Sequence, residues 1–404
     1  MIEWKISDLD IESTEKILLP EGAHFPEDAR NVIRCWHSTD VAACPGSGKT
    51  TVLLAKLKLL ADRMPFVNGT GICVLSHTNV AVNEIKKRLS GCADKLLSYP
   101  NFIGTIQSFV DKFVTMPYLR NFAGRNVQAV DNLTYAQHML NRMQNNPNYK
   151  SLNWVTKNSF ETGKQFSDRL DHTQALYIRD DGALCLGKLK KALAGANKPS
   201  AKQYNALIED LLKNEGIMRY KDAYSYANEA INDLPQAYTD LFSSRFQYVF
   251  IDEYQDCDDV QRRAIETIFN STKCTVIKIG DSDQAIYNSS EAETPDWVPQ
   301  DGFLPIMTSC RYSQEIANVI FKLKKDQQNI TTFAGKTGIK PILLVFNPDQ
   351  TNKVIGEFIN VLDTHGLYDN KGIYKAIGAI RKKDSSGLKI GSYWAEFDSS
   401  VKKQ

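Results

Sequence analysis

Short apolar runs recur along the chain, and each is followed by glycine, serine or acidic residues. This pattern is typical of strands buried on both faces of a sheet. The runs begin at Asp40 and cover residues 71–75, 247–251 and 275–279. Between them, apolar residues recur every three or four positions, as on one face of a helix. Such alternation predicts an α/β fold with a parallel sheet and helices on both of its faces.

Helical spacing is clearest over residues 51–60, with leucines at 53, 54, 57 and 60, and over residues 80–89. From residue 119 to 246 the chain changes to long polar-rich helical segments, including 202–212 and 222–234. Few β-branched runs occur there. We therefore expect a helical insertion between two parts of one sheet domain.

After Trp297 the pattern predicts helix 313–323, strand 341–346, helix 352–362 and strand 375–380. These elements indicate the opening of a second α/β domain. The chain then divides into residues 1–118 and 247–296 as two parts of the first domain, 119–246 as the insertion and 297–404 as a partial second domain.

Composition indicates an ordinary globular protein, with 42% hydrophobic and 24% charged residues. The N-terminus has no basic start followed by an apolar core, so no secretory signal is expected. The apolar runs are far shorter than the ~20 residues that cross a bilayer. No membrane partner is predicted.

The eight cysteines contain no CxxC pair, and the six histidines complete no zinc-binding spacing. This usage fits a reduced, cytoplasmic location. Net charge is only +2, so a nucleic-acid surface would depend on local arrangement. The lysines from 188 to 202 could follow a phosphate backbone, or they could form a solvated helical face.

A phosphate loop is predicted between the first strand and its helix. It consists of Ala43, Cys44, Pro45, Gly46, Ser47, Gly48, Lys49 and Thr50. The glycines would let backbone N–H groups surround phosphate oxygens, the lysine would meet the β/γ charge and the threonine would hold magnesium. The simpler alternative is a turn with a chance GxGKT sequence.

A second site follows the strand at 247–251. Asp252 could bind magnesium and Glu253 could orient an attacking water. Two acids after a strand also occur in solvated loops. Together with the phosphate loop, they predict a site for ATP and Mg²⁺.

Six segments in order resemble the successive motifs of UvrD/Rep-like superfamily 1 DNA helicases. They are ACPGSGKT, SHTN from Ser76, GTIQSF from Gly104, DEYQD from Asp252, GDSDQAIY from Gly280 and SCRYSQ from Ser309. The resemblance covers about residues 25–381. It implies a RecA-like P-loop NTPase sheet, a helical 1B insertion and a second, incomplete RecA-like domain.

The resemblance also implies roles for single residues. Gln284 would sense the γ-phosphate, and Arg311 would act as an arginine finger beside Lys49 and Glu253 in catalysis. Residues at the strand ends would contact single-stranded or forked DNA, namely Thr78, Asn79, Thr105, Ser108 and Tyr287. Helix capping is the alternative for Thr78 and Asn79.

The chain departs from the family pattern in several places. The adenine-reading glutamine is replaced by residues 26–30, the aromatic before the motif arginine by Cys310, and a tryptophan-containing stretch by Asn288–Ser289–Ser290. We expect loose nucleotide selection and a weaker grip on DNA. Counterparts of the last two motifs are not found before Gln404, so we expect either a truncated protein or completion by a partner.

The segments ACPGSGKT, LSHTN and FIGTIQSF further resemble UvrD-like proteins encoded beside OLD-family nucleases in Gabija-type antiphage defence. The resulting expectation is an ATP-dependent DNA helicase or translocase, with an OLD-family nuclease as partner. The alternative is a nucleotide- and DNA-sensing ATPase subunit that regulates such a nuclease without unwinding. A small-molecule kinase is disfavoured because no acceptor-binding pattern is present.

Overall fold

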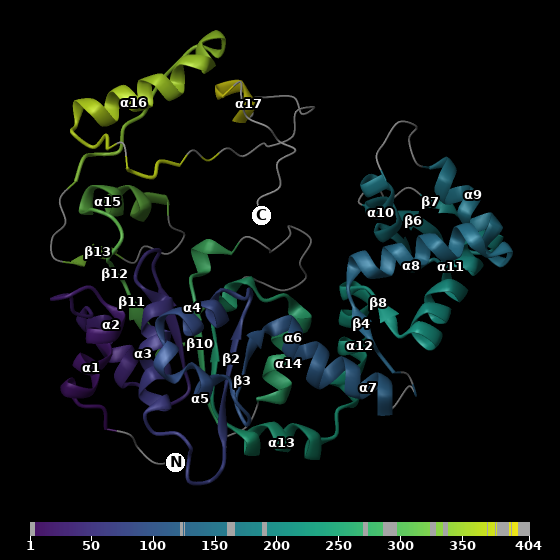
Figure 1. The fold of residues 1–404 in the computed structure, drawn as a ribbon, viewed down its shortest axis with the longest axis horizontal. Helices are drawn as coiled ribbons and strands as arrows, with labels where there is room; N and C mark the ends of the chain where they lie inside the picture. Colours follow the sequence, from purple (N-terminus) through teal and green to yellow (C-terminus); the bar gives the residue numbers. More distant parts are fainter. Residues whose placement is uncertain are drawn as a thin grey trace. The chain divides into compact units, whose positions relative to one another are not determined.

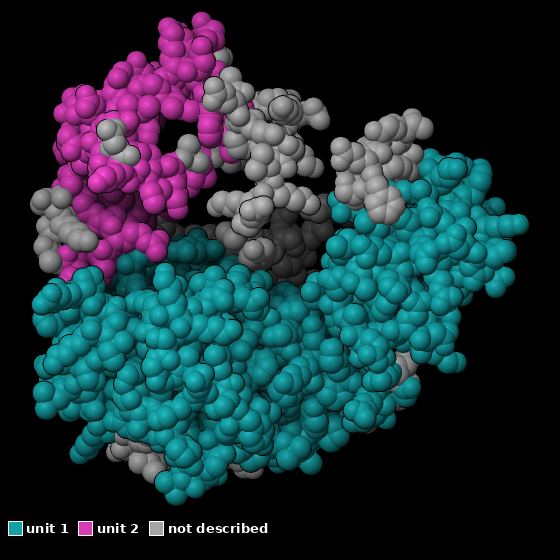
Figure 2. Space-filling view, in the orientation of Figure 1, with its two compact units in different colours: residues 1–308 teal, residues 309–404 magenta. Residues whose placement is uncertain are grey.

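The computed structural model describes residues 5–121, 124, 126–159, 166–187, 192–269, 274–285, 297–323, 329–333, 338–369, 371–375, 377, 388 and 390–394. The chain forms two compact units, Met1–Thr308 and Ser309–Gln404, which Figure 2 colours separately. Each unit has its own arrangement of elements.

The first unit is built on a six-stranded sheet in the order β11-β1-β10-β9-β2-β3 (Figure 1). All neighbouring strands in it are parallel. The strands are β1 (Thr39–Ala43), β2 (Gly71–Ser76), β3 (Phe102–Thr105), β9 (Phe246–Ile251), β10 (Thr275–Gly280) and β11 (Leu304–Ile306). The four predicted strands are confirmed. Strands β3 and β11 have only four and three residues and gave no distinct apolar run.

Side-chain alternation gives the sheet two buried faces. In β2, Ile72 and Val74 enter one hydrophobic core, while Cys73 and Leu75 enter the other. The first core is covered mainly by α1 (Asp8–Leu18), α2 (Glu27–Arg34), α3 (Lys49–Ala61), α4 (Val80–Arg88) and α5 (Ala93–Leu97). The second is covered by α6 (Ile106–Val110), α12 (Tyr220–Asp233), α13 (Gln236–Arg245) and α14 (Asp259–Ile268). This three-layer arrangement confirms the predicted α/β class.

The segment between β3 and β9 contains a compact body with its own core. Its helices are α8 (Asn132–Asn145), α9 (Lys150–Asn158), α10 (Phe166–Gln174) and α11 (Pro199–Asp210). Buried residues such as Tyr135, Leu152 and Tyr204 share this core. The insertion is not purely helical, because β5 (Leu176–Ile178), β6 (Leu184–Leu186) and β7 (Ala192–Ala194) form an antiparallel sheet. Strands of three residues are too short to show the alternation of apolar and polar residues from which a strand is predicted.

Remaining short elements lead into and out of this body. They are α7 (Met116–Asn121), β4 (Ala129–Val130) and β8 (Ile217–Met218), with β4 and β8 paired in parallel. The Thr115 hydroxyl, on a π-helical turn at Asp111–Thr115, donates to the Ala223 carbonyl in α12. The segment that leads into the insertion and the segment that leads out of it are therefore joined by a hydrogen bond.

The second unit contains α15 (Gln314–Leu323), α16 (Val354–Thr364) and α17 (Ile390–Tyr393), and a two-stranded sheet of β12 (Thr308–Ser309) and β13 (Thr331–Thr332). The helices predicted at 313–323 and 352–362 are confirmed within two residues. The strand predicted at 341–346 is wrong, since this segment has no regular secondary structure. Leu343 and Val345 are 86% and 88% exposed, so no second layer covers them. Most of the strand predicted at 375–380 lies outside the described residues.

The buried side chain of Lys56 joins α3 to the end of α2. Lys56 of α3 is fully buried, and its Nζ donates to the carbonyls of Val32, Ile33 and Cys35 at the end of α2. The ammonium lies 4.0 Å from the centre of the Trp36 ring. Burial lowers the pKa of Lys56 to about 7. Carbonyls at a helix end, which lack partners within the helix, thereby gain a donor; that of Val32 also accepts the Cys35 N–H at 3.2 Å.

Replacing Lys56 by methionine should destabilise the protein by about 2–4 kcal/mol, because it removes the buried ammonium donor from the carbonyls at the end of α2. Thermal unfolding followed by circular dichroism measures the effect. Lys58→Met is the matched control: this lysine pairs with Asp62 near the surface, and its loss should cost under about 1 kcal/mol. Equal losses in both variants would contradict the role given to Lys56.

Candidate active site

Parallel strands bring the motif loops to one edge of the sheet. The carboxyl ends of β1, β10, β9, β2 and β3 all lie there (Figure 1). The loops that follow them carry the phosphate loop, GDSDQ, DEYQD, SHTN and the segment after Gly104. Ligands of open parallel α/β sheets bind at this kind of edge.

The phosphate loop connects β1 to the N-terminus of α3. Gly46 and Gly48 have φ of 76° and 85°, a left-handed conformation that glycine adopts at little cost. The Cys44 N–H donates to the Ile306 carbonyl at 2.9 Å, and the Ser47 N–H donates to the Cys44 carbonyl at 3.2 Å. Ala43 and Cys44 are buried. The start of the loop is thus hydrogen-bonded to β11, and the loop turns back on itself between Cys44 and Ser47.

Ser47 supports a fit between this loop and a phosphate group. Its side chain is only 3% exposed, and within the described part of the chain its hydroxyl has no hydrogen-bond partner. Helix α3 begins at Lys49, so its unpaired N–H groups open toward the same loop. Pro45 and Thr50 are partly exposed on either side. An anion with several oxygens would satisfy these donors.

The acidic loop begins where β9 ends. The Asp252 N–H donates to the Leu75 carbonyl at 2.8 Å, which extends the pairing of β9 with β2. Asp252 is 5% exposed. Burial raises the pKa of its carboxyl to about 6; the charge of Glu253 adds to the shift, and the Lys49 ammonium opposes it. A divalent cation would relieve this buried charge.

Glu253 adopts a strained backbone conformation. Its φ is 54°, and it is the only described non-glycine residue with a positive φ. This conformation costs about 1–2 kcal/mol for a residue with a Cβ. It directs the side chain toward the phosphate loop, where the Lys49 Nζ lies 3.1 Å from the Glu253 Oε2. Strain of this kind persists where surrounding contacts hold it.

A chain of hydrogen bonds joins this ion pair to the end of β10. Gln255 donates to the Glu253 carboxylate at 2.8 Å, and its side-chain oxygen accepts the Asp281 N–H at 3.0 Å. Gln284 donates to the Asp281 carboxylate at 2.8 Å. Lys49, Glu253 and Gln284 therefore belong to one network. Gln255 and Asp281 were not predicted, although both lie inside motif segments.

Gly280 is closely packed between the side chains of Trp297 and Gln255. A Cβ at this position would lie 2.5 Å from the Trp297 ring and 2.7 Å from the side-chain oxygen of Gln255. Trp297 in turn packs edge-on against Tyr254, with ring centres 5.7 Å apart. The absence of a side chain at Gly280 thus leaves room for Gln255 to bridge two strand ends.

The predicted DNA contacts lie at the ends of two neighbouring strands: Thr78 and Asn79 on the loop after β2, Thr105 at the end of β3 and Ser108 in α6. After β2, Thr78 and Asn79 are exposed, and the Asn79 side chain makes no capping bond to α4. After β3, Thr105 caps α6 by accepting the Ser108 N–H at 3.0 Å. Helix capping is therefore observed at Thr105. The Thr78 hydroxyl accepts the Val80 N–H at the longer distance of 3.4 Å.

The loop after β2 is also coupled to the acidic loop. A ring nitrogen of His77 lies 2.9 Å from the Asp256 carbonyl. His77 was not among the predicted site residues, although it lies inside the SHTN motif. A contact of this kind gives a physical connection between the two loops.

Arg311 forms none of the described hydrogen bonds of this network. Arg311 belongs to the second unit, where its side chain is exposed and its N–H donates to the Ser309 hydroxyl at 3.3 Å. Tyr287 lies outside the described residues. At the position of the missing glutamine, the Asp28 carboxylate accepts the N–H groups of Met307 and Thr308 at 2.8 Å each. This contact attaches α2 to the end of β11.

Within the described residues, no group of three or more histidine, cysteine or acidic side chains could hold a metal ion. No disulfide joins any of the eight cysteines, all of which the structure describes. Among the described helices, none has the length and apolar character needed to span a membrane.

Comparison with known proteins gives consistent similarities. The model of the UvrD/REP helicase N-terminal domain matches residues 27–296. The Gabija protein GajB of Bacillus cereus is 24% identical over 77% of this chain and 53% of its own length. A probable DNA helicase II homologue of Rickettsia felis is 23% identical over 92% of the chain and 48% of its own length. The chain thus spans about half the length of these relatives.

A third relative is the ATP-dependent DNA helicase PcrA of Staphylococcus aureus. It is 23% identical over 61% of this chain and 31% of its own length. All of these similarities are compatible with the sheet and the motif loops described above.

The buried charge of Asp252 leads to a prediction for the metal-free protein. Because its pKa is raised to about 6, the native state bears an unfavourable charge above that pH and is relieved of it as pH falls toward 3.8. In EDTA, Asp252→Asn should be more stable than wild type by about 2–3 kcal/mol at pH 8 and by roughly half of that at pH 5.

Chemical unfolding at the two pH values measures these differences. Asp259→Asn, on the first turn of α14, is a suitable control. A destabilised Asp252→Asn, or a difference from wild type that does not depend on pH, would contradict the assignment of a buried, charged carboxylate.

Proposed function

The chain belongs to the UvrD/REP helicase family, and from this we propose that it is a DNA motor that hydrolyses ATP with magnesium and moves along single-stranded DNA. The observation that carries the proposal is the network from Lys49 through Glu253 and Gln255 to Asp281 and Gln284. It links three motif loops at the edge where parallel sheets bind ligands.

The residues of the motif segments would each suit one task in phosphoryl transfer. The N–H groups of the phosphate loop, the Ser47 hydroxyl and Lys49 would hold the phosphates. Thr50 and Asp252 would hold magnesium, which supplies charge neutralisation when bound. Glu253 would orient the attacking water, and Gln284 would contact the γ-phosphate. Arg311 of the second unit would stabilise charge that develops during transfer.

Lys49 already has an anionic partner in the Glu253 carboxylate, 3.1 Å away. A phosphate entering the loop would compete for the same ammonium. When Lys49 turns to phosphate oxygens, the carboxylate is released to accept a hydrogen bond from water. Gln255 would keep the side chain in place during this exchange, since it donates to the same oxygen. The pair is thus suited to switch partners with nucleotide.

Single-stranded DNA is the proposed polymer substrate. Thr78 and Asn79 are exposed after β2, and Ser108 is exposed after β3. Small hydroxyl and amide side chains suit phosphate and sugar contacts. The bond from His77 to Asp256 supports coupling between this DNA surface and the acidic loop.

Similarity to the Gabija protein GajB supports a role in antiphage defence. We propose a nuclease of the OLD family as partner, on the strength of the motif resemblance described above. Matches to a probable DNA helicase II and to PcrA favour a translocating motor over a subunit that only senses nucleotide and DNA.

Glu253→Gln tests the proposed site. The neutral amide weakens the hold on Lys49 and removes the group that orients water, so ATP should bind at least as tightly as to wild type while hydrolysis falls about 100-fold or more. Equilibrium binding of ATP and steady-state phosphate release give the two values.

Glu266→Gln is the matched control, because this acid pairs with Lys278 away from the phosphate loop. It should retain both binding and hydrolysis. Normal turnover in Glu253→Gln, or a loss of ATP binding in that variant alone, would show that Glu253 is not the water-orienting base.

Ser108→Asp tests the DNA surface. A negative charge at this exposed position should repel phosphates and weaken oligonucleotide binding about tenfold at low salt, with a smaller effect as salt rises. Ser98→Asp places the same charge in the segment before β3, at the opposite edge of the sheet, and should change affinity little. Similar losses in both variants would count against DNA binding at α6, where Ser108 lies.

A further inference from the structure

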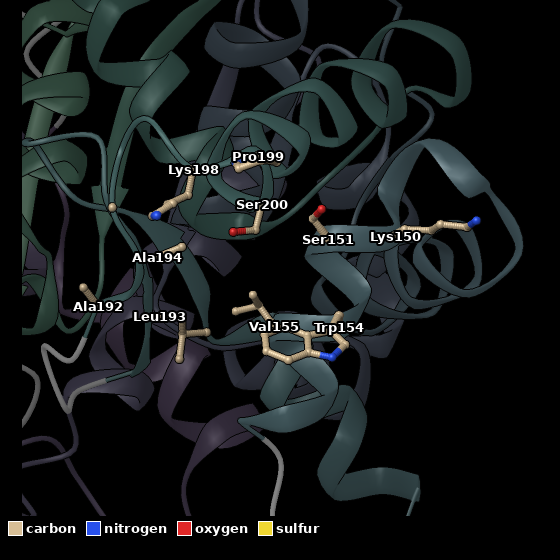
Figure 3. Close-up of a pocket in the computed structure, with 11 residues that line it drawn as sticks. Lys150, Ser151, Trp154, Val155, Ala192, Leu193, Ala194, Lys198, Pro199 and Ser200 are labelled. Atoms are coloured by element: carbon tan, nitrogen blue, oxygen red, sulfur yellow. The ribbon is translucent and has the colours of Figure 1, made fainter.

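The insertion carries a pocket of about 690 Å³ outside the motif loops. It is formed by α9, the end of β7 and the first residues of α11, and Figure 3 shows the residues that line it. A volume of this size is within the range of small-molecule sites in proteins.

Trp154 is the main aromatic surface of this pocket. Its side chain is 67% exposed, although the neighbouring positions Leu152 and Thr156 on α9 are buried in the core. In Figure 3 the indole ring lies beside Val155 and near Leu193. An exposed tryptophan supported by apolar side chains offers a flat surface on which a planar ring can stack.

Polar groups are concentrated on the other side of the same pocket. Figure 3 places the hydroxyls of Ser151 and Ser200 and the amine of Lys198 there. Lys150 is exposed as well, and in Figure 3 its amine extends away from the other lining residues, outside the pocket. No acidic residue lines the pocket, and in the part of the chain that the structure describes neither lysine forms an ion pair. The surroundings are therefore favourable for an anionic ligand.

We propose that this pocket binds a nucleobase of single-stranded nucleic acid, stacked on Trp154, with adjoining phosphates against Lys150 and Lys198. A nucleobase has apolar faces and a polar edge and is attached to an anionic backbone. These features match the indole, the serine hydroxyls and the lysines in turn. A base in a duplex has both faces covered, so the pocket selects single strands.

This inference rests on the proposed function, since it assumes that nucleic acid is a ligand of the chain. It adds a binding site on the insertion that the motif residues do not include. Of the lysines from 188 to 202, Lys198 would then contact phosphate and would be more than part of a solvated helical face.

The test is fluorescence anisotropy with a labelled oligothymidylate of about 12 nucleotides, without nucleotide, and with an abasic strand of equal length. Trp154→Ala should weaken binding of the oligothymidylate about tenfold, because stacking contributes ~1–3 kcal/mol per base. It should leave the abasic strand unaffected. Trp154→Phe should recover much of the affinity, and Lys198→Ala should weaken both strands.

Trp394→Ala removes another exposed tryptophan, 51% exposed in the second unit, and serves as the control that keeps wild-type affinity. Wild-type binding by Trp154→Ala would assign the pocket to another occupant, such as an apolar side chain of a protein partner, and overturn the inference. Equal losses for the two strands would do the same. Failure of the wild-type chain to bind either strand would overturn the proposed function as well, so the two failures are distinguishable.

Discussion

The ion pair between Lys49 and Glu253 is the interaction on which the candidate site depends. It joins the loop after β1 to the loop after β9, two strands separated in the sheet by β10. Gln255 and Asp281 then fasten the same carboxylate to the end of β10. The Lys49 ammonium and the Gln255 amide both hold the Glu253 carboxylate, and these contacts help to offset the cost of its strained backbone, with φ of 54°.

Much of this arrangement could be predicted from the sequence, because parallel strands buried on both faces give continuous apolar runs. The runs ending before Asp252 and at Gly280 identified β9 and β10, and motif order identified the loops after them. The bridge made by Gln255 could not be predicted. It requires two strand ends to approach within one side-chain length and requires space at Gly280, both of which are properties of the packed sheet.

Predictions from local pattern failed where an element depends on neighbours distant in sequence. Residues 341–346 are as apolar as a buried strand, yet they form none, since Leu343 and Val345 are exposed. Conversely, β5, β6 and β7 are short and irregular in pattern but pair with one another on the insertion. The exposed indole of Trp154 likewise gives no sequence signal, because helical spacing alone does not show which side chains the core leaves uncovered.

The central claim is that the motif loops form one site in which nucleotide hydrolysis responds to single-stranded DNA. The most direct measurement is magnesium-dependent phosphate release from ATP, with single-stranded DNA added in increasing amounts to wild type and to Lys49→Ala. Hydrolysis by wild type that rises and saturates with DNA, and none above background in the variant, is the predicted result. Equal rates in the two proteins, or a wild-type rate that DNA leaves unchanged, would contradict the account.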